Sequence, residues 1–282
     1  MKKLLLLPFL FLFLITSCSK NDDAEIITDD TSVAKQLMDV SYGSDSEQKI
    51  DIYLPAGRTD DTKVILLLHG GSWIAGNKSD MTYLVPTIQQ QFPNHAIVNI
   101  NYRLATQTSP AFPKQINDIE EVVKYLENSI YEISDDYAFI GFSAGGHLAM
   151  LYSYAYDKDH DVKAICNVVG PADFTDPEYL SHPLFATASK DLIGTSAPTE
   201  QQILAVSPVA HITVQAPPTI SFYGGQDPLV PATQGPRLKA ALDNVSVYNE
   251  FNFYANGGHA DWDLLTMMEV NSKISTFLNT RF

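Results

Sequence analysis

The chain has 282 residues, 45% of them hydrophobic and 18% charged, and its formal net charge is −15. This length and composition indicate a globular protein with a substantial core and exclude a largely disordered chain. The acidic balance argues against nucleic acid as a partner, because nucleic-acid-binding surfaces need clustered lysine and arginine.

The first 17 residues have the pattern of a secretory signal peptide. A basic start precedes an apolar run over residues 4–15, which is too short to span a membrane as a mature helix. Small residues then lead to Cys18 in the stretch Ile-Thr-Ser-Cys, which resembles the lipobox of bacterial lipoproteins. The resemblance implies that residues 1–17 are removed and that Cys18 carries a lipid. A plain signal peptide with an incidental cysteine is the alternative.

Residues 18–32 are polar and acidic without apolar periodicity, which predicts a flexible tether that begins at the lipidated Cys18. We therefore expect an exported protein that is anchored in the bacterial cell envelope, at the outer membrane, facing either the periplasm or the cell surface. Cys166, in an apolar run, is the one other cysteine of the sequence, so we expect no disulfide within the chain if Cys18 is acylated.

From residue 33 to residue 282 short apolar runs alternate with helical patterns, and we expect a single catalytic domain there. The predicted strands cover residues 49–54, 63–68, 96–101, 137–142, 162–169, 219–224 and 246–254. Several are continuous apolar runs, which are typical of strands covered on both faces of a parallel sheet. Helical spacing of apolar residues follows in 115–129 and 146–156. The alternation predicts an α/β fold, with a mostly parallel central sheet flanked by helices.

The stretch Gly141-Phe142-Ser143-Ala144-Gly145 joins a predicted strand to a predicted helix. This is the arrangement of a nucleophile elbow, in which the serine stands on a sharp turn and small neighbours let the backbone double back. We therefore expect Ser143 to present its hydroxyl at the carboxyl edge of the sheet as a nucleophile. Because a Gly-x-Ser-x-Gly match alone is common, this interpretation depends on finding partners for the serine.

A serine nucleophile needs a base, and the base needs an acid to orient it. In hydrolases with this elbow the chain order is serine, acid, then histidine. Asp227 follows the strand over 219–224, and His259 follows the strand over 246–254, so this order is met. Asp173, after the strand over 162–169, is the alternative acid. We interpret four other histidines as structural or solvated: His95, His147, His182 and His211.

A tetrahedral oxyanion needs at least two preplaced hydrogen-bond donors. We expect these donors to be the backbone N–H of Ala144, just after the nucleophile, and those of Gly71 and Ser72, in the loop after the strand over 63–68. Trp73 and Trp262 flank the catalytic loops and are candidate substrate contacts through ring stacking, with buried packing as the alternative. The segment from Phe174 to Ile212 is predicted to form a small cap over the site.

The stretches HGGSWIAGNKSD, NYRLA, GFSAGGHLA, GGQDPLVP and GGHADW together resemble α/β-hydrolases of the esterase/lipase type related to hormone-sensitive lipase. They resemble most of all the bacterial BD-FAE group of carbohydrate-esterase-like proteins. This resemblance implies a serine carboxylic-ester hydrolase that acts on a small ester or an acylated carbohydrate. It also makes acetyl or feruloyl esters of polysaccharide or oligosaccharide the expected substrates.

One position departs from the usual pattern of these relatives. Their oxyanion loop usually reads His-Gly-Gly-Gly, whereas Ser72 takes the third place after His69 here. Relatives of kynurenine formamidase also vary this position, so an arylformamidase-like amide hydrolase is the alternative function. A non-catalytic binding protein on a hydrolase scaffold is a further alternative, although no member of the triad is lost. We expect no cofactor and no metal, because no histidine or cysteine spacing indicates ligands.

Overall fold

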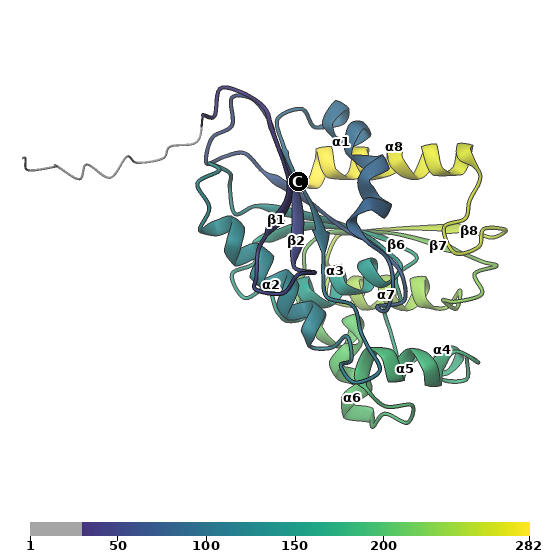
Figure 1. Cartoon of the computed structure of the whole chain (residues 1–282). Helices are drawn as coiled ribbons and strands as arrows, with labels where there is room; N and C mark the ends of the chain where they lie inside the picture. Colours follow the sequence, from purple (N-terminus) through teal and green to yellow (C-terminus); the bar gives the residue numbers. More distant parts are fainter. Residues whose placement is uncertain (1–29) are drawn as a thin grey trace, which may run out of the picture.

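An eight-stranded, mostly parallel sheet forms the centre of the protein (Figure 1). The computed structural model describes residues 30–282, so the predicted signal peptide, Cys18 and most of the predicted tether lie outside the described residues. Across the sheet the strand order is β1-β2-β4-β3-β5-β6-β7-β8. The strands are β1 (Lys35–Ser41), β2 (Lys49–Leu54), β3 (Val64–Leu68), β4 (Ala96–Asn101), β5 (Tyr137–Phe142), β6 (Val162–Val168), β7 (Thr219–Gly224) and β8 (Asn249–Tyr254).

The six strands β4, β3, β5, β6, β7 and β8 are parallel to one another, whereas β2 is antiparallel to β1 and to β4. The central strand β3 is a run of aliphatic residues without solvent exposure, as expected for a strand covered on both faces. The predicted α/β class with a mostly parallel sheet is therefore confirmed.

Two differences from the predicted strands have simple physical reasons. The edge strand β1 was not predicted, because its residues alternate between partly buried and exposed and form no apolar run. The last strand β8 begins at Asn249 rather than at residue 246. The amides of Ser246 and Val247 instead donate to the Asp243 and Leu242 carbonyls, at 3.0 Å each, and close a turn after the preceding helix.

Helices cover both faces of the sheet (Figure 1). On one face lie α1 (Val85–Gln91), the short 3-10 helix η1 (Lys78–Leu84) and the C-terminal α8 (Leu264–Arg281). On the other face lie α2 (Lys114–Glu127), α3 (Ala144–Ala155) and α7 (Gln234–Asn244). Each helix buries an apolar side against the sheet, which produces two cores separated by the strands.

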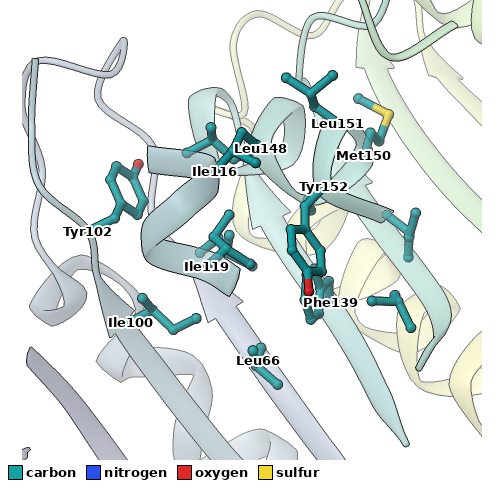
Figure 2. Packing of buried hydrophobic residues seen from close by; sticks show 14 of the residues in the cluster. Leu66, Ile100, Tyr102, Ile116, Ile119, Phe139, Leu148, Met150, Leu151 and Tyr152 are labelled. Carbon is teal, nitrogen blue, oxygen red and sulfur yellow. The ribbon is translucent and has the colours of Figure 1, made fainter. Parts of the chain in front are cut away.

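The packing of α2 and α3 against the sheet holds the helix that follows Ser143 in place. Figure 2 shows Ile116 and Ile119 of α2 above Ile100, and Tyr152 of α3 beside Phe139 of β5. The rings of Tyr152 and Phe139 are stacked with their centroids 5.8 Å apart. All of these side chains are buried, so α3 is held along its length rather than only at its first turn.

The chain between β6 and β7 forms the predicted cap. It contains α4 (Pro177–Leu180), α5 (Phe185–Ile193), α6 (Glu200–Val206) and the 3-10 helix η2 (Pro208–His211). Figure 1 shows α4, α5 and α6 grouped together to one side of the sheet. Within residues 30–282 no helix has the length and apolar character needed to cross a membrane.

Candidate active site

The chain turns sharply at Ser143, between β5 and α3. Its φ of 52° and ψ of −119° are unfavourable for a residue with a side chain. A Cβ at Gly141 would lie 2.3 Å from the carbonyl oxygen of Gly145, and a Cβ at Gly145 would lie 2.2 Å from that of Leu68. The Ser143 amide donates to the Val168 carbonyl at 2.8 Å, which ties the turn to β6. Both glycines are therefore required by the close approach of the backbone.

A chain of hydrogen bonds links Ser143 to two residues from later loops. His259, in the loop after β8, has Nε2 at 2.7 Å from the Ser143 Oγ. Its Nδ1 lies 2.7 Å from Oδ2 of Asp227, in the loop after β7. Because an ionised carboxylate only accepts hydrogen bonds, Nδ1 carries the proton and Nε2 accepts from the serine hydroxyl. The structure thus brings together the three residues of the predicted triad.

Asp227 is held in a fixed orientation below His259. Its Oδ1 accepts hydrogen bonds from the backbone N–H groups of Leu229 and Val230, at 2.8 and 2.9 Å. The Asp227 side chain is 1% exposed, whereas that of His259 is 17% exposed. The buried carboxylate therefore presents its second oxygen to the imidazole, which keeps one edge open toward solvent and substrate.

Asp173, the alternative acid, makes different contacts. Its Oδ2 lies 2.5 Å from Nε of Arg237 in α7, and its Oδ1 accepts from the amide and the hydroxyl of Thr175. Both oxygens of Asp173 are therefore occupied by other groups, and Asp227 is the carboxylate that contacts His259.

Two backbone hydrogen bonds connect the loops that carry Asp227 and His259. The Gly225 amide donates to the Tyr254 carbonyl at 2.8 Å, and the Gln226 amide donates to the Gly257 carbonyl at 2.9 Å. The adjacent strands β7 and β8 are parallel, so their carboxyl ends and following loops meet at one edge. These contacts fix the distance between the acid and the base.

The loop after β3 lies directly against the elbow. A Cβ at Gly70 would lie 3.2 Å from the Cβ of Ser143. The loop then passes through three residues with positive φ, Gly71 (111°), Ser72 (50°) and Trp73 (65°). Among residues 30–282, the amides of Gly71, Ser72 and Ala144 donate to no protein acceptor. Ala144 is the first residue of α3, where amide N–H groups lack partners within the helix.

The two tryptophans occupy different places. Trp73 lines the cavity beside Ser143 with a small part of its surface, but its ring is 3% exposed and its N–H donates to Nδ1 of His147 at 3.1 Å. Trp262 lies in a separate hollow formed by residues 253–266. Its ring packs against Tyr254, with centroids 4.7 Å apart, and its N–H donates to the Gly258 carbonyl. Trp262 therefore does not line the cavity beside Ser143, because its ring packs against Tyr254 of β8, and a substrate contact at this ring stays a prediction.

A cavity of about 210 Å³ opens beside Ser143 and His259. The cap supplies the largest share of its wall, and the elbow after β5 and the loops after β3, β6, β7 and β8 supply the rest. The lining residues are Ser72, Trp73, Ile74, Ser143, Ala144, Pro171, Tyr179, His182, Leu184, Phe185, Thr187, Ala188, Asp191, Leu229, Val230 and His259. Most of these are apolar, and Asp191 is the single acidic residue among the described lining residues.

Three histidines outside the triad contact the site or its supporting loops. His182 belongs to the cavity wall rather than to solvent or core, which the sequence did not reveal. His147 is fully buried in α3, and burial lowers its pKa to about 4. His69 is also buried, which lowers its pKa; its ring stacks on Tyr102 with centroids 4.2 Å apart, and its Nδ1 lies 2.7 Å from the Gly70 carbonyl oxygen. The contact of His147 with the oxyanion loop joins residues 74 positions apart, so no local pattern in the sequence indicates it.

The part of the chain that the structure describes contains no group of three or more His, Cys, Asp or Glu residues arranged to hold a metal ion.

The profile of the BD-FAE family matches residues 50–242, a range that includes Ser143, Asp227 and the loop after β3 and ends before His259. The chain belongs to the BD-FAE family. This BD-FAE chain is 27% identical to a kynurenine formamidase of Danio rerio over 236 residues, which cover 78% of this chain and 76% of that protein. It is 29% identical to the probable carboxylic ester hydrolase LipM of Mycobacterium tuberculosis over 237 residues, 76% of this chain but only 54% of LipM.

Solved structures share the fold of this BD-FAE chain. A truncated form of a carbohydrate esterase from gut microbiota superimposes with a TM-score of 0.72 at 23% identity, covering 88% of this chain and 99% of that one. An esterase of Thermogutta terrifontis superimposes with a TM-score of 0.68 at 19% identity, covering 88% and 94%. Together with the family, these similarities identify an ester-bond hydrolase with the α/β-hydrolase fold.

Proposed function

We propose that the protein is a serine carboxylic-ester hydrolase that works by acyl transfer through Ser143, His259 and Asp227. The observation that carries this proposal is the pair of 2.7 Å contacts from His259 to the Ser143 Oγ and to the Asp227 carboxylate. A serine hydroxyl becomes an effective nucleophile only when a base is in hydrogen-bond reach and correctly oriented.

In the first half of the reaction, Ser143 Oγ forms a bond to the ester carbonyl carbon while its proton moves to Nε2 of His259. The resulting imidazolium is stabilised by the carboxylate of Asp227 at Nδ1. When the tetrahedral intermediate collapses, the bond to the leaving oxygen breaks and Nε2 returns its proton to that oxygen. The alcohol leaves, and the acyl group stays on Ser143.

In the second half, water takes the place of the alcohol. His259 removes a proton from the water, the hydroxide forms a bond to the acyl carbon, and the bond to Ser143 Oγ breaks as Nε2 protonates it. The carboxylic acid leaves, and the starting state of the triad is restored. Atoms balance with water as the co-substrate, and no further group is required.

Negative charge develops on the substrate carbonyl oxygen in both halves. We assign its stabilisation to the backbone N–H groups of Ala144, Gly71 and Ser72, which lie next to the nucleophile in sequence or in the loop packed against it. The N-terminus of α3 adds a favourable partial charge at the same place. Ser72 donates through its backbone N–H, so a serine in place of the usual glycine still supplies this hydrogen bond to the oxyanion.

The shape of the cavity supports a small or medium acyl or alcohol group. About 210 Å³ of mostly apolar space lies beside Ser143, and a carbohydrate esterase is among the proteins that share the fold. We infer that acetyl or feruloyl esters of polysaccharide or oligosaccharide are the substrate class. An arylformamidase-like amide hydrolase is the second candidate, which the similarity to a kynurenine formamidase favours.

The test is hydrolysis of p-nitrophenyl acetate by the purified protein and by Ser143→Ala, followed by acetylated and feruloylated xylan and by N-formylkynurenine. We expect serine-dependent release from p-nitrophenyl acetate and from at least one of the xylans. Turnover of N-formylkynurenine alone would replace the esterase by the formamidase. Equal, near-zero rates for both proteins on every substrate would leave a binding protein on a hydrolase scaffold.

We also propose that the enzyme is exported and anchored by a lipid on Cys18. The support is the basic start, the apolar run over 4–15 and the lipobox-like residues before this cysteine. Cells that express the full chain should incorporate labelled palmitate, and Cys18→Ala should abolish the labelling. Unchanged labelling in that variant would contradict the anchor without affecting the esterase.

A further inference from the structure

The backbone of the loop after β3 is held in an unfavourable conformation. Ser72 and Trp73 are consecutive residues with side chains, and both have positive φ, 50° and 65°. The left-handed region suits glycine, because a Cβ there crowds the backbone. Such a conformation persists only when surrounding contacts fix it. The neighbours of Trp73 therefore determine where the amides of this loop point.

The backbone and the ring of Trp73 are both anchored. Its carbonyl accepts from the Ala105 amide and from Nε2 of Gln115, each at 2.8 Å. Its indole N–H donates to Nδ1 of His147 at 3.1 Å, and its ring lies 6.2 Å from that of Phe174. With 3% exposure and its N–H occupied, the indole is unsuited to stacking on a substrate.

The partners of His147 determine its proton position. Nε2 lies 2.8 Å from the Val206 carbonyl oxygen, which only accepts, so Nε2 carries the proton. Nδ1 faces the N–H of Trp73, which only donates, so Nδ1 is unprotonated. The imidazole is neutral, in agreement with its burial and with the lowered pKa of about 4.

His147 also contacts the nucleophile. Its backbone N–H donates to the carbonyl of Ser143 at 3.0 Å, as part of the first turn of α3. One residue is thus bonded through its backbone to the elbow and through its side chain to the loop of Gly71 and Ser72. Because α3 is packed against the sheet along its length, His147 is a rigid reference point for that loop.

We propose that the hydrogen bond between Trp73 and His147 is a positioning contact that keeps the amides of Gly71 and Ser72 aimed at the oxyanion on Ser143. The inference rests on the proposed function, because the oxyanion forms only in acyl transfer. It replaces the predicted role of Trp73 as a substrate contact. It also gives a reason for tryptophan at this position, since phenylalanine would fill the space and leave Nδ1 of His147 without a donor.

Three substitutions separate this contact from mere packing. Trp73→Phe keeps an aromatic ring and removes the N–H. His147→Gln retains a donor near the Val206 carbonyl but removes the acceptor for Trp73. His147→Asn is the matched control, because its side-chain oxygen can take the place of Nδ1 while the bond to Val206 is lost.

Hydrolysis of p-nitrophenyl acetate by the purified protein supplies the kinetic test. Removing an oxyanion donor costs about 10²–10³ in kcat, and a displaced donor costs less. We therefore expect Trp73→Phe and His147→Gln to lower kcat about tenfold and to leave KM within about twofold, and His147→Asn to retain kcat within about threefold. Inhibition by a small alkylboronic acid, which forms a tetrahedral adduct on the serine, should weaken by the same factor as kcat.

Five outcomes would overturn the proposal. A raised KM with unchanged kcat in Trp73→Phe would make Trp73 a substrate contact. Unchanged kcat in both Trp73→Phe and His147→Gln would remove the positioning role and leave the esterase in place. A larger loss in His147→Asn than in His147→Gln, or an equal loss in the two, would assign the effect to the Val206 contact or to folding, respectively. If wild type and Ser143→Ala release product at the same rate, the proposed function itself fails, and the positioning role falls with it.

Discussion

Oδ2 of Asp227 lies 2.7 Å from Nδ1 of His259, whereas Asp173 directs its own Oδ2 to Arg237 at 2.5 Å. Both aspartates follow parallel strands at the same edge of the sheet, so only the side-chain contacts distinguish them. We expect Asp227→Asn to lower kcat by about 10³–10⁴, because an amide favours the wrong imidazole tautomer. Ester hydrolysis measured under saturating substrate checks this expectation.

Asp173→Asn is the matched control. It removes the same charge but breaks the contact with Arg237 rather than the contact with His259, so we expect kcat to stay within about threefold and stability to fall by about 1–2 kcal/mol. Urea unfolding measures the second quantity. Retained turnover in Asp227→Asn together with lost turnover in Asp173→Asn would reverse the assignment of the acid.

The backbone conformation of Ser72 in the oxyanion loop predicts how substitutions at this position change activity and stability. Its φ is 50°, its side chain is exposed, and only its backbone N–H enters the proposed mechanism. Ser72→Gly should therefore keep kcat within about twofold, because glycine adopts positive φ without strain. Ser72→Val should lower stability by about 1–2 kcal/mol and lower kcat, since a β-branched residue is strained there. Equal kinetics for both variants would contradict a role for this backbone conformation.

The position of Asp191 in the cavity wall predicts how its substitution changes the choice of substrate. It lines the cavity beside Ser143 and also a second hollow of about 380 Å³, lined in addition by Thr106, Gln107 and Lys190. A carboxylate in such a wall accepts hydrogen bonds from sugar hydroxyls or from an ammonium group. We expect Asp191→Asn to lower kcat/KM for acetylated xylo-oligosaccharides about tenfold more than for p-nitrophenyl acetate. A loss of this size corresponds to one lost hydrogen bond to a charged group.

The same variant separates the two candidate functions. N-formylkynurenine carries an ammonium group, so an amide hydrolase of this kind should lose more activity on that substrate than on any sugar ester. Equal losses on all three substrates would show that Asp191 acts on the fold of the cap and not on recognition. Thr187 lines the same two hollows as Asp191. A matched Thr187→Val variant therefore measures the effect of removing a neutral polar contact.

Much of the fold was predictable because it depends on local patterns. Continuous apolar runs such as residues 64–68 are typical of buried parallel strands, and the spacing of Ile116, Ile119 and Leu126 is typical of a helix with one buried side. Ser143 was predictable because Gly141 and Gly145 mark the elbow in the sequence, and a Cβ at either position would lie within 2.5 Å of a backbone carbonyl oxygen. These features depend on residues that are adjacent in sequence.

Several contacts were missed from the sequence, some of them between distant residues. Whether Trp73 faces substrate or core depends on His147, 74 positions along the chain. Trp262 packs against Tyr254 of the strand just before it, a contact over a short separation that no periodic pattern marks. The short helices of the cap also escaped detection, since polar and small residues dominate that segment and only its fold directs His182 and Asp191 into the cavity. The periodicity of apolar residues along the sequence does not show which side chains contact each other in this way.

The burial of His147 predicts how stability depends on pH. Its pKa is lowered to about 4 in the folded protein, below the value of 6.5 for a free histidine, so the unfolded chain binds the proton more readily. The contribution of His147 to the free energy of unfolding is fully present above about pH 6.5. It decreases as the pH falls toward 4 and changes no further below that pH. Between pH 7 and pH 5 the loss should be about 2 kcal/mol.

Urea unfolding of wild type and of His147→Asn at pH 7 and pH 5 isolates this contribution. Both proteins share the other titrating groups, including His69 and His95, whose pKa values burial also lowers, and the effects of those groups cancel in the comparison. Because asparagine does not titrate, the variant should lose about 2 kcal/mol less than wild type on acidification. Identical losses would mean that His147 takes up its proton in the folded state, which would break its contact with Trp73.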